Sequence, residues 1–136
     1  MHFYALIHKE PRSCYGVSFP DVPGCISAGD TLDEAVTNAV EALSGHLAVT
    51  RDHGEPLPSP RPLEALRRDA NVKREIGTGA VLVAVPLLLD NGRTVRANLS
   101  LDAGLLDAID EAARKRGLTR SAFLATAARE KIAADR

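Results

Sequence analysis

The chain has 136 residues, 45% of them apolar and 26% charged, which is typical of a folded globular protein and excludes a disordered one. No apolar run approaches the ~20 residues that a membrane-spanning helix needs. The first residues, MHFYALIHKE, lack the basic and long apolar regions of a secretory signal. These features predict a cytoplasmic protein without membrane contact, in which Cys14 and Cys25 stay reduced and behave as small buried hydrophobic residues.

The formal net charge of −1 conceals two regions of opposite sign. Residues 1–92 carry 8 Lys and Arg against 12 Asp and Glu, a net charge of −4. Residues 93–136 carry 9 against 6, a net charge of +3. We therefore expect two modules, at residues 1–90 and 93–136, and the basic one is the candidate for phosphate contact.

The first module opens with β-like runs. Residues 2–8 (HFYALIH) are apolar on both faces and predict an interior strand that is covered on both sides. Residues 14–19 (CYGVSF) alternate and predict a second strand, and the intervening residues 9–12 are expected to form a hairpin loop. The apolar face of this second strand consists of Tyr15, Val17 and Phe19. The prolines and glycine of FPDVPGC predict a turn before a short strand at residues 25–28.

A helix is expected next. Thr31 and Glu34 form a capping box, in which each side chain can accept a hydrogen bond from an N–H group at the start of the helix. The helix should end before Gly54. Its apolar stripe at helical spacing consists of Leu32, Val36, Ala39, Val40, Leu43 and Leu47.

The middle of the chain is interrupted by prolines. Residues 55–62 (EPLPSPRP) cannot form a regular helix and predict an extended surface connector. A short helix is expected at residues 63–69. The valine-rich run at residues 80–89 predicts a further strand, in which Pro86 indicates an edge position or the end of the strand. Residues 90–92 (DNG) predict a turn or linker between the modules.

The basic module begins with an alternating run, RTVRANLSL, at residues 93–101. Its polar face consists of Thr94, Arg96, Asn98 and Ser100, and its apolar face of Val95, Ala97, Leu99 and Leu101. This pattern predicts a strand. Two helices should follow, one from about Ala103 to Arg116, ended by Gly117, and one with Thr119 as its N-cap. Their buried stripes are predicted as Leu105, Leu106, Ile109, Ala112 and Ala113, and as Phe123, Leu124, Ala127, Ala128 and Ile132.

A strand with two short helices buries too little surface for a stable monomer, and its lone strand leaves both edges unpaired. Both difficulties disappear if two copies pair their strands antiparallel and interlock their helices. The paired strands then form a ribbon that fits the major groove of B-DNA. The alternative is a helical hairpin docked on the first module, with residues 93–101 as another strand of its sheet. Against this alternative, that strand would present arginine and asparagine on a face without an evident polar partner.

The run from Val95 to Ile132 resembles the ribbon-helix-helix domain of small bacterial repressors. The polar–apolar ribbon ending in Leu101-Asp102, the spacing to Gly117 and the GLTRS turn carry this resemblance. By position, the resemblance implies that DNA bases are read by Arg96, Asn98 and Ser100, since Arg pairs with guanine and Asn with adenine. It also implies a phosphate site at the start of the second helix, formed by Thr119, Arg120 and Ser121.

The first module resembles antitoxins of the HicB type. The matching residues are Phe19, Pro20, Asp21, Pro23, Gly24, Cys25, Gly29, Asp30, Thr31, Glu34 and Ala35. The resemblance implies an α+β chain, with a degraded, partial ribonuclease-H-like sheet and one main helix, followed by a dimerising ribbon-helix-helix domain. It implies an antitoxin that occludes the active site of a HicA-like RNA-cleaving toxin and represses the operon by binding operator DNA. Residues 51–79 contribute nothing to the resemblance.

Enzymatic activity and cofactors are not expected. Ribonuclease-H chemistry needs converging carboxylates, but the only acid of the first strand, Glu10, lies at its far end. Four further acids cluster in sequence, namely Asp21, Asp30, Asp33 and Glu34. Of these, Glu34 is explained by the capping box and Asp33 by the helix dipole. The alternative function is a repressor whose first module senses a small ligand or metal. Its candidate ligands are His2, His8, His46, His53, Cys14 and Cys25, but none has the close spacing of a zinc motif.

The sequence does not identify the residues that contact the toxin. A net charge of −4 on the first module suits a basic, RNA-binding partner. The connector at residues 55–62 is a candidate binding strip because an extended proline-rich segment loses little entropy on docking. A plain surface linker is the simpler interpretation, and we favour it.

Overall fold

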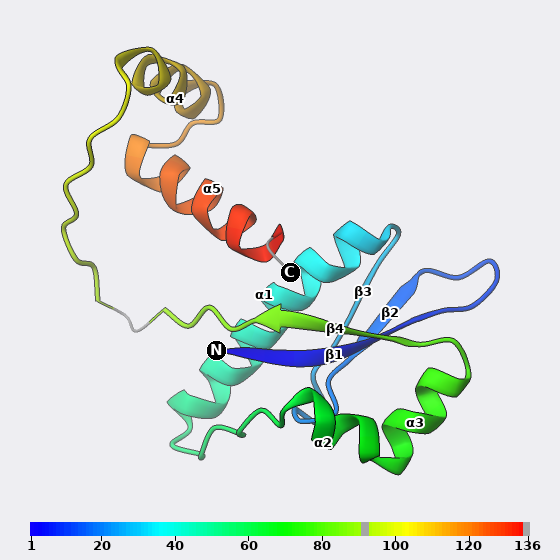
Figure 1. The fold of residues 1–136 in the computed structure, drawn as a ribbon. Helices are drawn as coiled ribbons and strands as arrows, with labels where there is room; N and C mark the ends of the chain where they lie inside the picture. Colours follow the sequence, from blue (N-terminus) through cyan, green and yellow to red (C-terminus); the bar gives the residue numbers. More distant parts are fainter. Residues whose placement is uncertain (91–92, 135–136) are drawn as a thin grey trace. The chain divides into compact units, whose positions relative to one another are not determined.

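The computed structural model of the protein describes residues 1–90 and 93–134 (Figure 1). The chain divides into two compact units, a sheet domain at residues 1–89 and a helical unit that begins at Asp90. Residues 91–92 of the predicted linker and residues 135–136 of the predicted second module lie outside the described residues.

Within residues 1–89, all of which are described, four strands form an antiparallel sheet in the order β3-β2-β1-β4 (Figure 1). The strands are β1 (His2–Lys9), β2 (Tyr15–Ser18), β3 (Ile26–Gly29) and β4 (Val81–Pro86). β1 lies between β2 and β4, which confirms the prediction of an interior strand. β4 is an edge strand that ends at Pro86, as expected for a residue that cannot donate a ladder hydrogen bond.

Helices cover both faces of β1, which explains why this strand is apolar on both sides. The helices of the sheet domain are α1 (Leu32–Asp52), α2 (Leu63–Arg68) and α3 (Ala70–Gly77). Leu6 of β1 packs with Leu66 of α2 and Val72 of α3 in one buried cluster. α1 packs against the sheet on the other face (Figure 1). The side chains of β1 that alternate away from Leu6 are also buried, namely Phe3, Ala5 and Ile7.

The start of α1 follows the predicted capping box with one difference. The Thr31 hydroxyl accepts a hydrogen bond from the Glu34 N–H group at 3.1 Å, as predicted. The Glu34 carboxylate accepts from the N–H group of Asp30 at 3.0 Å, one residue before the N-cap. The predicted stripe is buried except for Leu32, which is 43% exposed. Leu32 is the first residue of α1, and the buried residues of this helix begin at Ala35.

α3 was not predicted from the sequence. The expected helix at residues 63–69 ends at Arg68, and Asp69 adopts an extended conformation that breaks the chain into two helices. The Asp69 carboxylate then caps α3, because it accepts hydrogen bonds from the N–H groups of Asn71 and Val72 at 2.8 and 3.2 Å. An aspartate three residues before a buried Val72 was the signal for this second helix.

The helical unit contains α4 (Ala103–Lys115) and α5 (Arg120–Ala134). Asp102 caps α4 by accepting from the Leu105 N–H group, and Gly117 has a φ of 67°, which confirms its role in ending the helix. Thr119 caps α5 through the Ala122 N–H group at 3.1 Å, as predicted. The predicted stripes are only partly correct, since Ile109 and Ala113 are buried while Leu105 is 51% and Ile132 is 43% exposed.

Residues 93–102 form no strand within the described part of this single chain. They are also absent from the sheet of the first module, which argues against the docked-hairpin alternative. The predicted strand requires a second copy of the chain as its hydrogen-bonding partner and therefore stays a prediction. None of the described helices is both long enough and apolar enough to cross a membrane.

Candidate functional site

The predicted base-reading residues are all accessible. Arg96, Asn98 and Ser100 are exposed, and so are the alternate apolar residues Val95 and Leu99, at 70% and 66%. A segment whose polar and apolar faces are both exposed has covered neither face within its own chain. Both faces are therefore available for contacts with other molecules.

An open groove of about 590 Å³ brings this segment to the start of α5. Two predicted base-reading residues, Asn98 and Ser100, line the groove together with two predicted phosphate-binding residues, Arg120 and Ser121. Leu99, Leu106 and Leu124 supply apolar walls. Arg96 and Thr119 do not line the groove, so the structure brings four of the six predicted residues together.

Backbone N–H groups at the amino-terminal end of α5 are free to bind a ligand. Thr119 uses its hydroxyl for the Ala122 N–H group and its carbonyl for the Phe123 N–H group. Among the described residues, the N–H groups of Arg120 and Ser121 have no acceptor. Unpaired N–H groups at the positive end of a helix dipole attract anions. The role predicted for this end of the helix is therefore consistent with its hydrogen bonding.

Arg120 has a partner that the sequence reasoning missed. Its guanidinium donates from Nε to Oδ1 and from Nη2 to Oδ2 of Asp110, at 2.8 and 2.9 Å. The hydrogen bonds from Arg120 lower the pKa of Asp110, and the same bonds raise the pKa of Arg120. The two residues lie ten positions apart on opposite sides of the Gly117 turn. Only a fold that returns α5 along α4 makes them neighbours, so their spacing in the sequence carried no direct signal.

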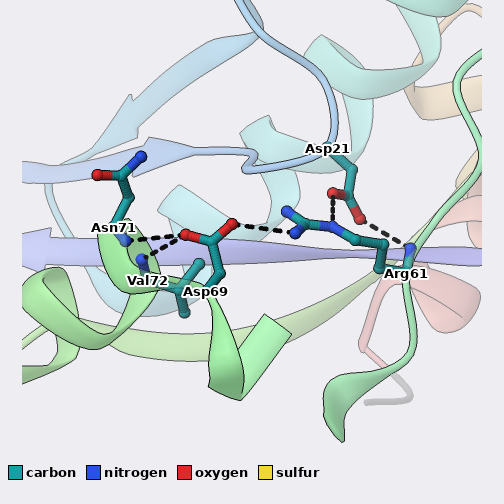
Figure 2. A network of polar contacts seen from close by, with 5 residues as sticks. All are labelled: Asp21, Arg61, Asp69, Asn71 and Val72. Carbon is teal, nitrogen blue, oxygen red and sulfur yellow. Dashed lines mark hydrogen bonds and ion pairs between the residues drawn. The ribbon is translucent and has the colours of Figure 1, made fainter. Parts of the chain in front are cut away.

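A second polar network holds the proline-rich connector to the sheet domain (Figure 2). The backbone N–H group and the Nε of Arg61 donate to Asp21, at 2.8 and 2.6 Å, and Nη1 donates to Asp69 at 3.0 Å. The Asp21 side chain is only 8% exposed. The guanidinium of Arg61, followed by the N–H groups of α3, lowers the pKa of Asp69. The connector is therefore anchored at its end, next to the turn between β2 and β3.

This network also bears on the acids considered for catalysis. Asp21 is paired with Arg61, and the Glu34 carboxylate accepts from the backbone at the start of α1. In residues 1–90 and 93–134, no group of three or more His, Cys, Asp or Glu is placed to hold a metal ion. Of the histidines considered as ligands, His8 lies 3.3 Å from the carboxylate of Glu75.

The two cysteines differ. Cys25 is buried, as predicted, and burial raises the pKa of its thiol. Cys14 is exposed, so the prediction that both thiols are buried was wrong for Cys14, which lies just before β2 begins.

Comparison with known proteins covers nearly the whole chain. A family model described as the HicB-like antitoxin of bacterial toxin–antitoxin systems matches residues 3–128. The chain belongs to this family. Because the match extends into the helical unit as far as residue 128, it includes the groove as well as nearly all of the sheet domain.

Individual relatives agree with this assignment. The crystal structure of the Burkholderia pseudomallei antitoxin HicB is 35% identical, with a TM-score of 0.58, over 97% of this chain and 98% of that one. A chain in a structure described as the HicA3 and HicB3 toxin–antitoxin complex is 32% identical, with a TM-score of 0.53, over 64% of this chain and 98% of that one. An uncharacterized 14.9 kDa protein of Haemophilus phage HP1 is 37% identical over 95% of this chain and 96% of its own length. The chain thus has the α+β fold of HicB antitoxins, as predicted.

Proposed function

We propose that the chain is the antitoxin of a toxin–antitoxin pair and acts through two separate surfaces. The sheet domain binds a HicA-like RNA-cleaving toxin and occludes its active site. The helical unit dimerises as a ribbon-helix-helix domain, binds operator DNA and represses the operon. The observation that carries this proposal is the family match at residues 3–128, which includes both units.

The toxin-binding part is supported by a relative and by charge. One similar structure is described as a complex of HicA3 with HicB3. Residues 1–92 carry a net charge of −4, which favours encounter with a basic protein that binds RNA. The β1-β2-β3 meander followed by α1 supports the ribonuclease-H-like description of this domain, and the pairing of Asp21 with Arg61 supports the view that it has no nuclease activity.

The DNA-binding part is supported by the exposure and chemistry of residues 93–101 and of the start of α5. Pairing of two such segments would cover exposed Val95 and Leu99 and leave a ribbon of polar side chains. In this arrangement Arg96, Asn98 and Ser100 read bases, while Thr119, Arg120 and Ser121 contact phosphate.

Co-purification tests the toxin-binding part. The tagged chain is expressed with the product of the adjacent gene, and the eluate is examined for a small basic protein. We expect a stable complex that releases an RNA-cleaving activity after denaturation and refolding of the partner. A chain that purifies alone, and that leaves RNA cleavage by the neighbouring product unchanged when mixed with it, would refute toxin inhibition.

Arg96→Ala tests the DNA-binding part. Loss of a base contact should weaken binding to the duplex upstream of this gene by about 1–3 kcal/mol. Arg93→Ala is the matched control, because it removes the same charge from the same segment on the opposite side of the alternation. Equal losses for the two variants would show that the segment acts through charge alone and does not read bases.

A further inference from the structure

We propose that Asp110 is a positioning residue for DNA recognition, which acts by fixing the guanidinium of Arg120 beside the groove. This inference rests on the proposed DNA-binding function. It adds a residue that lies outside the predicted ribbon and outside the start of α5. It also assigns a use to an acidic side chain in a module of net charge +3, where an unpaired negative charge would oppose DNA binding.

The geometry of the pair leaves Arg120 able to bind. A guanidinium has five N–H donors in one plane. Asp110 accepts from Nε and from one hydrogen of Nη2, so the other hydrogen of Nη2 and both hydrogens of Nη1 remain. These three donors point away from Asp110 because the group is planar and rigid. Arg120 lines the groove together with Asn98 and Ser100, so a phosphate at the start of α5 meets an oriented donor.

Pairing with Asp110 reduces the net positive charge around Arg120 but fixes the orientation of its guanidinium. Asp110 cancels most of the positive charge of Arg120 at a distance, which weakens attraction to any DNA. In return the long Arg120 side chain is held by two charge-assisted hydrogen bonds before DNA arrives, and less conformational entropy is lost on binding. This exchange lowers affinity for DNA in general and raises the affinity for a duplex whose phosphates match the fixed donors.

Positioning and simple repulsion predict opposite signs. If Asp110 only repels DNA, its neutralisation tightens binding to every duplex, because fewer negative charges oppose the phosphates. If Asp110 positions Arg120, its neutralisation weakens binding to the operator although the net charge becomes more favourable. Binding to unrelated DNA, which depends on charge and not on register, should not weaken.

The experiment uses the full chain and two labelled duplexes of equal length in a titration followed by fluorescence anisotropy. One duplex is the region immediately upstream of this gene, and the other has the same composition in shuffled order. Asp110→Asn keeps the size of the side chain but accepts only one of the two hydrogen bonds. Asp107→Asn is the matched control, because it removes the same charge from an exposed position of α4 that does not contact Arg120.

We expect Asp110→Asn to weaken binding to the upstream duplex about tenfold, as for one lost hydrogen bond to a charged group, and to leave binding to the shuffled duplex equal or tighter. Asp107→Asn should weaken neither. In an Arg120→Ala background, Asp110→Asn should no longer weaken binding to the upstream duplex, because no guanidinium remains to position. A structural role that merely joins α4 to α5 would not change the ratio of the two affinities in this way.

Three outcomes overturn the inference: Asp110→Asn tightens binding to both duplexes, it behaves like Asp107→Asn, or its effect persists without Arg120. Failure of the unchanged chain to prefer the upstream duplex is distinct from these, since it would refute operator binding itself and this inference with it. The thermal unfolding midpoint of each variant establishes that the compared chains are folded.

Discussion

The two units of the chain differ in how completely they bury their apolar side chains. The largest fully buried side chains all belong to the sheet domain, and they are Phe3, Val36, Leu43, Leu47, Leu66, Val72 and Val85. Among residues 93–134, Ile109 is the only buried side chain of comparable size, while Val95, Leu99 and Leu105 are more than half exposed. The sheet domain therefore completes its core within one chain. The helical unit leaves an apolar surface that a second copy can cover.

The strongest test of a self-contained core is Leu43→Ala in α1. Leu43 is 0% exposed, and truncation of a fully buried leucine costs about 2–5 kcal/mol of unfolding free energy. Denaturant unfolding at several protein concentrations measures this loss. The loss should not depend on concentration, because both sides of the core come from one chain. Leu32→Ala, at an exposed position of the same helix, is the matched control and should cost less than about 1 kcal/mol.

Leu99→Ala tests the complementary statement about the helical unit. Leu99 is 66% exposed in one chain, so its truncation should cost little if the unit acts alone. If a second copy covers Leu99, each side chain contributes about 1.5–3 kcal/mol, and the dissociation constant of the dimer should rise at least about tenfold. Analytical ultracentrifugation measures this constant. Ile26→Ala is the control, because Ile26 is 74% exposed in the sheet domain, and a dimer weakened equally by both changes would contradict the comparison.

Gly29→Ala tests how closely the elements of the sheet domain approach one another. A Cβ atom on Gly29 would lie 2.4 Å from the backbone nitrogen of Ala35, so β3 and the start of α1 would have to separate. We expect a loss of about 1–3 kcal/mol in unfolding free energy. Gly16→Ala is the control, because a Cβ there meets nothing within 4 Å. Equal stability of the two variants would show that this packing has more room than the structure indicates.

The smallest expected effect concerns the acid stability of the sheet domain. Because Arg61 lowers the folded-state pKa of Asp69, the pair contributes stability above the unfolded pKa of about 3.9, and this contribution is lost as the pH falls through the lower folded value. Arg61→Ala should therefore reduce the decline of the thermal midpoint between about pH 5 and pH 2. Arg67→Ala, which removes an exposed arginine of α2, is the control. Parallel pH curves for all three proteins would refute this linkage.

The sequence determined the local elements of the sheet domain because their signals are short-range. An apolar run on both faces predicted β1, Thr31 and Glu34 predicted the start of α1, and Pro86 predicted the end of β4. The same kind of signal predicted Thr119 as the N-cap of α5 and the turn at Gly117 that ends α4. Each of these features depends on residues within a few positions of one another, so that local hydrogen bonds and backbone sterics decide it.

The tertiary structure alone decided the contacts between distant residues. Asp21 and Arg61 lie 40 positions apart, and Asp110 and Arg120 lie ten apart across a turn, so no local pattern could pair them. The carboxylate of Asp69 also binds Arg61 eight positions earlier, a contact that the capping signal at the start of α3 does not encode. The sequence thus determined most of the helices, strands and turns, although not the helix α3 that follows Asp69. Packing decided which charges meet, because ion pairing depends on distance in space and not along the chain.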